Sequence, residues 1–482
     1  MAKQTTHERL NLLLGAVAPD TGPQPSAAMA LAHLAAVYVE PADDIVWLAL
    51  SVLRAELPVR EDIVALRRRF RLEDPAKVLS GLAKHPYRLG GRVIRPHVRV
   101  VSDAVVIDVH HTAQTGLATG IQRVVRKTLA EWLTKHELML VGWSSSYDGM
   151  RELSPAEREN AAYGTAPEAT APENNELLVP WRSSYVLPEL AIENDRTARI
   201  AALAEFSGNR ALLIGFDCVP LTSAETTGAG MGAAFARNLV AATYFERIAT
   251  ISEAAATEYG GWRTMLVSAG KAGPDVRSVF LPADAAAATE AQLAAAEKYL
   301  TVDGLPLVFC VGSHEPRKNH LAVLAAAELL WSDGDEFSLA FVGGNAWGSD
   351  EFQSLLETLS AKGRSVIGVS KITDELLWGG YRAARCTIFP SLNEGFGLPV
   401  AESLAVGTPV VTSGYGSMLE IAAAGGAVLV DPRSDEDIAR GLRSALFEPG
   451  VNERLRAEAA QRPIRTWSDY ADDLWAYFFP NE

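Results

Sequence analysis

The sequence contains little cysteine and no long hydrophobic run. Only three of its 482 residues are cysteines, and they lie far apart, at Cys218, Cys310 and Cys386. This spacing argues against a disulfide framework and a Cys-x-x-Cys metal site, and it favours a reducing, cytoplasmic location. The start of the chain lacks a signal-peptide pattern, and no stretch reaches the roughly 18 to 20 apolar residues of a membrane span. We expect a cytoplasmic protein; peripheral contact with the inner face of a membrane stays open.

Basic residues are outnumbered by acidic ones. The 44 lysines and arginines against 59 aspartates and glutamates give a net charge of −15. A protein that binds duplex nucleic acid usually carries a net basic face, so this balance argues against nucleic acid as a partner. The share of apolar residues, 48%, is that of a folded globular protein. The length corresponds to about three domains.

Residues 1–100 are predicted to be helical, with no strand pattern before Val98. Apolar residues recur at helical spacing in three segments, Asp44–Leu57, Arg60–Phe70 and Asp74–Ala83. The arginines at 67–69 and 71 fit a solvated helix face, and contact with anionic lipid or an acceptor phosphate is the alternative. We interpret this region as an extension that docks a partner, recruits an acceptor or mediates self-association; the oligomeric state stays open.

From Val98 onward, β-branched runs alternate with helical segments, which is typical of α/β domains. A first unit is predicted with strands at Leu138–Trp143, Ala211–Phe216 and Phe245–Ser252, and with residues 144–176 as a long loop. After a linker and helix at 283–300, a second unit is predicted with strands at Pro306–Gly312, Phe337–Gly343, Ser365–Val369, Cys386–Pro390, Pro409–Ser413 and Ala427–Val430. Two such units in series suggest a ligand-binding cleft at the carboxyl ends of their strands.

The segment Ser391–Pro399 (SLNEGFGLP) follows a predicted strand and opens a predicted helix. Gly395 and Gly397 let the backbone approach a ligand closely because they carry no Cβ, and the N–H groups at a helix start favour an anion. Glu394 and Glu402 could both face one cleft, where carboxylates accept hydrogen bonds from sugar or ribose hydroxyls. A glycine-rich helix entry without a ligand is the alternative.

The segment Gly312–His320 (GSHEPRKNH) also joins a predicted strand to a predicted helix. Arg317 and Lys318 stand side by side just before that helix. Two fixed cations at a helix N-terminus make a site for a diphosphate, whose charge must be neutralised when it leaves a sugar. An idle surface pair is the alternative, and the glutamate-containing loop in the same unit argues against it.

These motifs resemble the retaining glycosyltransferases of family 4, of the "glycosyl transferases group 1" type. The resemblance covers about residues 103–480 and is strongest in VGSHEPRKNH, FVGG and FPSLNEGFGLPVAESLAVGTPVVTSGYGSMLEI, with their Glu-x7-Glu spacing. It implies an α/β protein with the GT-B fold, two Rossmann-like domains facing a cleft. The implied divisions are a helical N-terminal region (1–100), an acceptor domain (101–285), a nucleotide-sugar donor domain (286–465), and a last helix (466–482), N-capped by Ser468, that crosses back to the acceptor domain.

The resemblance also implies roles for individual residues. Arg317 and Lys318 would contact the donor diphosphate, and Glu394 the donor sugar; these three are the predicted catalytic residues. Glu402 would contact the ribose, and the base would lie near residues 369–372. The predicted donor-binding residues are Thr119, Gly120, Gly312, Ile372, Gly395, Phe396, Gly397, Leu398 and Glu402.

The first α/β unit matches the family in part. Gly116–Arg126 (GLATGIQRVVR) resembles the family's glycine-containing loop, with Thr119 and Gly120 toward the diphosphate and Arg123 toward the cleft. Arg126 is interpreted as part of a solvated helix face. Many members carry a His-Asp-x-x-Pro segment, whose histidine lies near the reacting sugar; here the matching segment is FDCVP, and Phe216 replaces that histidine.

The replacement at Phe216 leaves the acid/base group of the reaction undetermined. His110 and His111, at the end of the first strand of this unit, could reach the cleft instead; a polar residue at a strand end that only supports the fold is the alternative. Retaining transfer in this fold is usually described as front-face, with the departing phosphate taking the acceptor proton, so it needs positioning and charge more than a dedicated base.

The implied function is transfer of a hexose from a nucleotide diphosphate sugar to a hydroxyl of a glycan or lipid-linked glycan in bacterial polysaccharide biosynthesis. The cationic loop, Gly312–His320, resembles in its EPRKN form the loop of bacterial mannosyltransferases, and this resemblance favours mannose from GDP-mannose, with UDP-glucose and similar donors as alternatives. No Asp-x-Asp metal motif stands where a GT-A enzyme would need it, and no His/carboxylate cluster has metal spacing, so we expect no cofactor and no metal dependence. The rival interpretations are an inactive nucleotide-sugar-binding scaffold or regulator, suggested by Phe216, and a nucleotide-sugar 2-epimerase.

Overall fold

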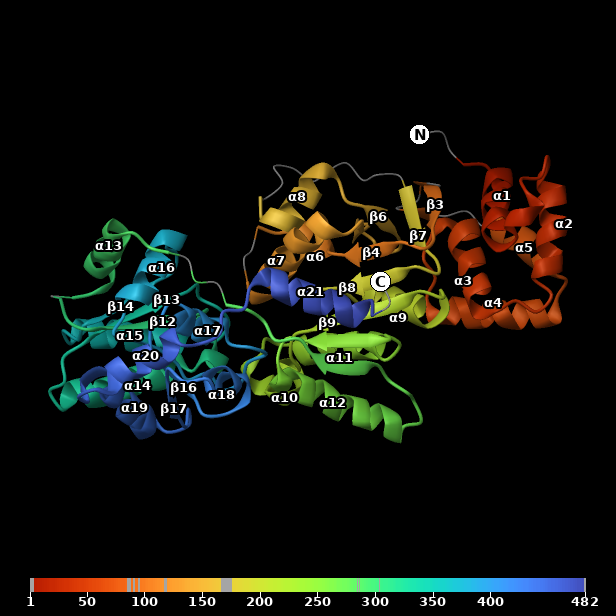
Figure 1. The fold of residues 1–482 in the computed structure, drawn as a ribbon. Helices are drawn as coiled ribbons and strands as arrows, with labels where there is room; N and C mark the ends of the chain where they lie inside the picture. Colours follow the sequence, from red (N-terminus) through yellow and green to blue (C-terminus); the bar gives the residue numbers. More distant parts are fainter. Residues whose placement is uncertain are drawn as a thin grey trace.

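The computed structural model describes residues 4–480 except 85–87, 90–91, 94–95, 117–118, 166–175, 284, 286 and 303. Three parts lie in a row: a helical region, a first α/β domain in the middle and a second α/β domain (Figure 1). None of the described helices is both long enough and apolar enough to span a membrane.

The helical region consists of α1 (Thr6–Val17), α2 (Ala27–Val37), α3 (Asp43–Leu50), α4 (Arg60–Leu72) and α5 (Pro75–Lys84). The helix predicted over Asp44–Leu57 is shorter than expected: α3 ends at Leu50, and the chain continues as one π turn, Ser51–Ala55. The prediction assumed a helix with one apolar face, but residues 46–50 are all buried. The end of this helix is therefore determined by packing on all of its sides.

Two short strands precede Val98, contrary to the prediction. β1 (Arg88–Leu89) pairs antiparallel with β2 (Arg92–Val93), and β3 (His97–Val101) follows. Strands of two residues are too short to show the alternation of apolar and polar residues from which strands are recognised.

The first α/β domain is built on a nine-stranded sheet of order β11-β10-β9-β8-β4-β5-β6-β7-β3, in which only β6 runs antiparallel to its neighbours. Besides β3, the strands are β4 (Val105–Asp108), β5 (Met139–Trp143), β6 (Met150–Glu152), β7 (Glu176–Pro180), β8 (Ser184–Leu187), β9 (Arg210–Gly215), β10 (Arg247–Thr250) and β11 (Asp275–Ser278). The helices are α6 (His110–Gln114), α7 (Gly120–Lys135), α8 (Pro155–Tyr163), α9 (Asn194–Phe206), α10 (Val219–Thr222), α11 (Met231–Ala242) and α12 (Glu253–Ser268).

The long loop predicted over residues 144–176 holds a strand and a helix, so the prediction was wrong for its described part. β6 lies at 150–152, and α8 begins with a capping box in which Ser154 and Glu157 bond each other's backbone N–H groups. Residues 166–175 lie outside the described residues. The Ser-Pro-x-Glu pattern at the start of α8 is typical of a helix N-terminus. The polar composition of the surrounding segment led to the prediction of a loop instead.

The second α/β domain is built on a six-stranded parallel sheet of order β14-β13-β12-β15-β16-β17. Its strands are β12 (Leu307–Val311), β13 (Ser338–Val342), β14 (Val366–Val369), β15 (Cys386–Phe389), β16 (Val410–Ser413) and β17 (Ala427–Val430), all within the predicted ranges. Its helices are α13 (Glu290–Leu300), α14 (His320–Ser332), α15 (Asp350–Ala361), α16 (Asp374–Ala383), α17 (Leu398–Ala405), α18 (Gly416–Ala422), α19 (Asp435–Phe447) and α20 (Val451–Ala460).

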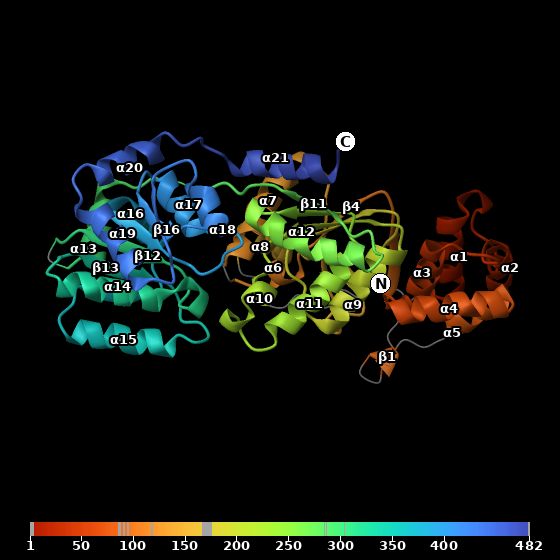
Figure 2. The ribbon, with the colours of Figure 1, turned by 90° about the horizontal axis from the view of Figure 1, so that it is seen from below.

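The last helix, α21 (Trp467–Phe478), leaves the second domain and lies along the first (Figure 2). It packs against α7, where the Trp132 indole Nε1 donates to the Ala471 carbonyl at 2.9 Å. Its N-cap is Thr466 rather than the predicted Ser468, because Thr466 and Asp469 form a capping box. The Ser468 hydroxyl instead accepts a hydrogen bond from Lys135.

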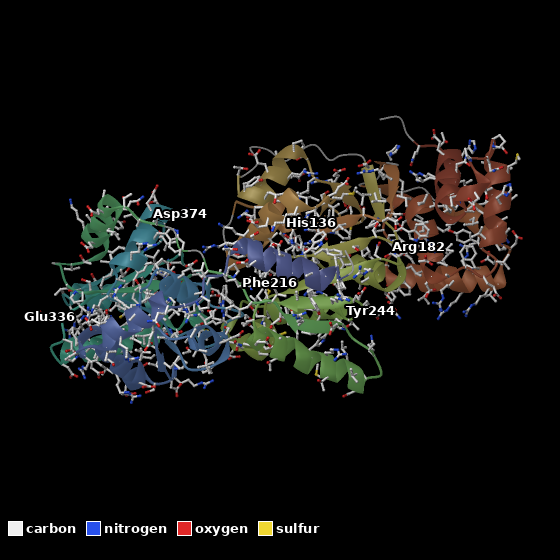
Figure 3. The ribbon with its side chains drawn as sticks, viewed as in Figure 1. His136, Arg182, Phe216, Tyr244, Glu336 and Asp374 are labelled. Atoms are coloured by element: carbon white, nitrogen blue, oxygen red, sulfur yellow. The ribbon has the colours of Figure 1, made fainter. Side chains whose placement is uncertain are left out.

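The helical region and the first domain share one hydrophobic core. Apolar side chains from α1 to α5 and from β3 to β10 form a single buried cluster. The Gln4 amide hydrogen-bonds both the N–H and the C=O of Val98 in the edge strand β3. Arg182, which Figure 3 shows where the two parts meet, pairs with Asp44 at 2.8 Å. The region is therefore an integral layer of the first domain.

Candidate functional site

Two strand-to-helix loops of the second domain lie side by side. β12 leads through a short 3₁₀ turn, Pro316–Lys318, into α14, and β15 leads through residues 390–397 into α17. Because β12 and β15 are parallel neighbours, their following loops leave the same edge of the sheet. The Arg317 carbonyl accepts from the Leu392 N–H at 2.9 Å and from the Ser391 hydroxyl at 2.9 Å, which ties the loops together.

The three predicted catalytic residues meet at these loops. One carboxylate oxygen of Glu394 lies 2.5 Å from the Lys318 ammonium, and the other lies 2.5 Å from the Arg317 guanidinium. The Ser391 hydroxyl donates to the same carboxylate at 2.7 Å. Burial acts to raise the pKa of Glu394, but Arg317 and Lys318 hold it at about 2. The carboxylate is therefore charged at neutral pH.

The surroundings hold the two cations in place. Arg317 also contacts Glu315 at 3.2 Å and donates to the Asn393 carbonyl at 2.8 Å. The Lys318 ammonium lies 4.8 Å from the centre of the Phe389 ring, and its aliphatic stem runs 3.7 Å from where a Cβ at Gly312 would be. Both cations are mostly buried, so a ligand that reached them would meet preoriented positive charge.

The glycine-rich loop, residues 390–397 between β15 and α17, presents its backbone to the junction between the domains. Among the residues that the structure describes, none accepts a hydrogen bond from the N–H groups of Gly395, Phe396 or Gly397. Gly397 has a φ of +106° at the N-cap of α17, a conformation that favours glycine. Three unpaired N–H groups at a helix start suit an anion or hydroxyl groups. The Phe396 side chain itself is buried, 4.9 Å from the Phe280 ring.

Gly395 lies directly against the first domain. A Cβ at this position would come within 2.6 Å of the Phe216 carbonyl and 2.9 Å of an Asp217 carboxylate oxygen. The Ser252 hydroxyl donates to the Gly395 carbonyl at 2.6 Å. Figure 3 shows Phe216 on the side of the first domain nearest to the second. The segment that matches the family's His-Asp-x-x-Pro motif thus meets the glycine-rich loop.

Gly395→Ala is expected to force the two domains apart at this contact and to reduce nucleotide binding and activity strongly. The Cβ would overlap the Phe216 carbonyl oxygen, a backbone atom that cannot rotate away, and would crowd the Asp217 side chain. The matched control is Gly261→Ala, at an exposed glycine of α12 where a Cβ would meet nothing within 4 Å. Thermal unfolding and small-angle scattering of both variants check the expectation; equal profiles and equal activity for the two variants would contradict it.

Asp217 was predicted only as a retained motif residue, yet its environment is unusual. Burial raises the pKa of Asp217 to about 6, with Glu258 and Glu394 adding to the rise and Arg317 opposing it. One oxygen of its carboxylate accepts from the Val219 N–H at 3.1 Å. A carboxyl group whose pKa is raised by burial beside charged groups is typical of functional sites.

Glu402 connects three elements at the same junction. Its carboxylate accepts from the Tyr381 hydroxyl of α16 at 2.8 Å and pairs with Arg123 of α7, which belongs to the first domain. Arg123 therefore faces the second domain at this junction. Gly120, at the start of α7, lies close to Leu398 of the second domain. A Cβ at Gly120 would be 3.8 Å from a methyl carbon of the Leu398 side chain. Ribose hydroxyls would compete with two hydrogen-bond donors for Glu402.

The remaining predicted residues lie around this centre. Thr119 is exposed and is the N-cap residue of α7; residues 117–118 of the same loop lie outside the described residues. Ile372 is half-buried between β14 and α16 and packs in the small core that α13 and α16 share. Arg126 was interpreted as solvated, and this was wrong: it is buried and donates to the carbonyls of Asn160 and Thr115.

The two histidines at the end of β4 differ from each other. The His110 Nδ1 accepts from the Trp143 N–H at 3.0 Å, and burial lowers the pKa of His110 to about 4. His111 is partly exposed and pairs with Glu193 at 2.6 Å. His110 therefore supports the fold, whereas His111 is accessible.

The cationic loop and the glycine-rich loop lie in the part of the chain that matches a known family model. Residues 293–462 match the family model described as Glycosyl transferases group 1. The chain is 27% identical over 376 residues to the serotype-specific mannosyltransferase WbdA of Escherichia coli, which is 73% of this chain and 42% of the relative. It is 32% identical over 161 residues to the O-antigen chain mannosyltransferase B of Escherichia coli, 33% of this chain and 42% of that relative. The chain spans less than half the length of these curated relatives.

A solved structure shares the architecture. HepE of Anabaena, in complex with UDP and glucose, superposes with a TM-score of 0.56 at 13% sequence identity, over 78% of this chain and 99% of that chain. The chain thus has the GT-B fold, preceded by a helical region. Together the comparisons support a glycosyltransferase. The finer assignment to family 4 and the roles of single residues remain predictions.

Proposed function

We propose that the protein is a retaining glycosyltransferase of family 4 that transfers a hexose, preferably mannose from GDP-mannose, to a hydroxyl of a glycan or lipid-linked glycan in bacterial polysaccharide biosynthesis. The observation that carries the proposal is the buried cluster of Arg317, Lys318 and Glu394 beside the N–H groups of residues 395–397, from which no described residue accepts a hydrogen bond. The mannose preference is supported by the names of the two Escherichia coli relatives.

The proposed chemistry needs charge and position more than a dedicated base. When the bond between the sugar and the diphosphate breaks, negative charge develops on the departing phosphate. Arg317 and Lys318, held by Glu394, would stabilise that charge without rearranging, and the amides of the glycine-rich loop would add hydrogen bonds. Glu394 would then exchange part of its contact with the cations for hydrogen bonds from the donor sugar. We propose that no metal or other cofactor takes part.

An inactive nucleotide-sugar-binding scaffold is the second candidate, because Phe216 replaces the motif histidine. The two candidates share the donor site and differ only in turnover. Release of nucleotide from any nucleotide sugar would reject the scaffold.

A thermal-shift titration with GDP, UDP, dTDP and ADP, each with and without EDTA, tests the donor site. A nucleotide at about 100 times its dissociation constant stabilises the native state by roughly 2.7 kcal/mol, which raises the melting temperature measurably. We expect selective stabilisation by GDP, unchanged by EDTA because the proposed phosphate ligands are side chains and backbone amides. Selective stabilisation by another nucleotide would overturn the GDP assignment alone, and stabilisation by none would overturn the proposed donor site.

A further inference from the structure

The parallel strands β4, β8 and β9 end at one edge of the first sheet. Ile107 of β4 pairs with Val186 of β8, and Leu187 of β8 pairs with Leu213 of β9. Neighbouring strands lie about 4.8 Å apart, so the ends of β4 and β9 lie roughly 10 Å apart. The end of β9 carries Asp217, which lies against the glycine-rich loop. The residues that follow β4 therefore lie beside the proposed donor site.

A buried ionic network fixes the turn after β4. Arg196, which is fully buried, donates to Asp108 at 2.9 Å and to Glu189 at 2.8 Å. The Glu189 carboxylate accepts from the N–H groups of His111 and Thr112, at 2.8 and 2.9 Å. Burying this many charges costs stability unless each is paired. The network therefore holds the backbone of His111 rigidly at the strand end.

The His111 ring is held by one nitrogen and leaves the other available. Its Nε2 lies 2.6 Å from a Glu193 carboxylate oxygen. Glu193 is the N-cap residue of α9, yet its side chain makes no capping bond there and instead reaches His111. No described residue hydrogen-bonds the His111 Nδ1, and the contact of Nε2 with Glu193 is an ion pair rather than an aligned hydrogen bond. About a third of the side chain, 34%, is exposed.

We propose that the His111 Nδ1, with the ring fixed by Glu193, accepts a hydrogen bond from a hydroxyl of the acceptor sugar and orients it toward the donor. Because a carboxylate carries no proton, the ring nitrogen that faces Glu193 is the one that keeps the proton in the neutral ring, and Nδ1 is then an acceptor. His111 is thus an acceptor-binding residue, on the strand end two strands from the position where Phe216 replaces the motif histidine. This inference rests on the proposed glycosyltransferase function.

The charges around His111 determine its pH dependence. The ion pair with Glu193 raises the pKa of His111, burial and Arg196 act to lower it, and Glu189 adds to the rise; His110 is the neighbouring titratable ring. Protonation converts Nδ1 from an acceptor to a donor. Transfer to the acceptor is therefore lost as the pH falls through the pKa of His111, which lies above its ordinary value. Removal of the Glu193 charge lowers this pKa, so the loss then occurs at lower pH.

The test separates acceptor use from donor use. Nucleotide release from the selected nucleotide sugar is measured without an acceptor and with a panel of p-nitrophenyl α- and β-hexosides, on the full chain. We expect His111→Ala to raise the acceptor KM or lower acceptor kcat/KM roughly 10- to 100-fold, a larger loss than that of nucleotide release without an acceptor. His111→Gln, whose amide oxygen can accept a hydrogen bond, is expected to recover part of the loss. His33→Ala, at an exposed histidine of the helical region, is the matched control.

Glu193→Gln provides the second, independent measurement. We expect the acidic limb of its acceptor kcat/KM profile to lie at lower pH than in the wild-type protein. Equal loss of release with and without acceptor in His111→Ala, or an unchanged acceptor KM and kcat, would overturn the assignment of His111 while leaving the proposed function intact. Absence of nucleotide release by the wild-type protein under every condition would overturn the proposed function and this inference with it.

Discussion

Lys318→Ala is expected to reduce sugar transfer by roughly 10²- to 10³-fold while the protein stays folded. One positioned donor on a developing negative charge contributes about that much to a rate. The fold is expected to survive because Glu394 keeps two partners, Arg317 at 2.5 Å and Ser391 at 2.7 Å. Steady-state kinetics and thermal unfolding of the variant measure the two effects separately. Lys362→Ala is the matched control, since that lysine is 58% exposed and lies 3.9 Å from its acidic partner.

Glu394→Gln tests the same cluster through stability. Removing this carboxylate leaves Arg317 and Lys318 buried together without their shared counter-charge, a change that costs roughly 3–5 kcal/mol of unfolding free energy. The pKa of Glu394 is about 2 in the folded protein against an ordinary value of 4.5. Its stabilising contribution is therefore complete above pH 4.5 and is lost as the pH falls toward 2.

The difference in unfolding free energy between wild type and Glu394→Gln should accordingly shrink as the pH is lowered from about 4.5 to 2. Denaturant unfolding at several pH values measures it. A difference that stays constant with pH, or near-normal transfer by both Lys318→Ala and Glu394→Gln, would contradict the roles assigned to this cluster.

The sequence predicted the cationic loop and the glycine-rich loop because each is a local strand–turn–helix pattern whose chemistry lies within ten residues. Arg317 and Glu394 are far apart in the chain, but both follow strands of one parallel sheet, so their meeting could be expected. The individual strands of the second domain were predicted for the same reason, since each is a short apolar run bounded by turns.

Contacts between elements that are far apart in the sequence could not be predicted in this way. Nothing in α7 distinguishes Arg123, which pairs with Glu402, from Arg126, which is buried against loop carbonyls. Arg196 reads as an ordinary polar residue of an amphipathic helix, although it is fully buried among carboxylates. Only the packing of α9 and α7 on the sheet determines which of these cations lose contact with water.

A chain that begins at His97 is expected to be insoluble or to lose cooperative folding of the first domain. The sheet of that domain ends in β3, and the π turn packs against β3 and β7 while α3 and α4 pack against α9. Each large apolar side chain that loses this cover costs about 1.5–3 kcal/mol, so a few such exposures consume the roughly 5–15 kcal/mol by which a domain is stable. Solubility, light scattering and thermal unfolding of the shortened chain measure the effect.

The edge strand makes this outcome more severe than a loss of packing. In the full chain the Gln4 amide bonds the N–H and the C=O of Val98, and α1 and the π turn cover the same strand. Without them, β3 presents unpaired backbone groups to other chains, which is a template for aggregation. Trp47→Ala in the full chain isolates the packing contribution, because Trp47 is fully buried and its truncation costs about 3–5 kcal/mol; Leu72→Ala, at a side chain 84% exposed, is its control. A shortened chain that stays monomeric, binds nucleotide and melts at the wild-type temperature would show instead that the helical region is a separate module, free to act as a docking unit.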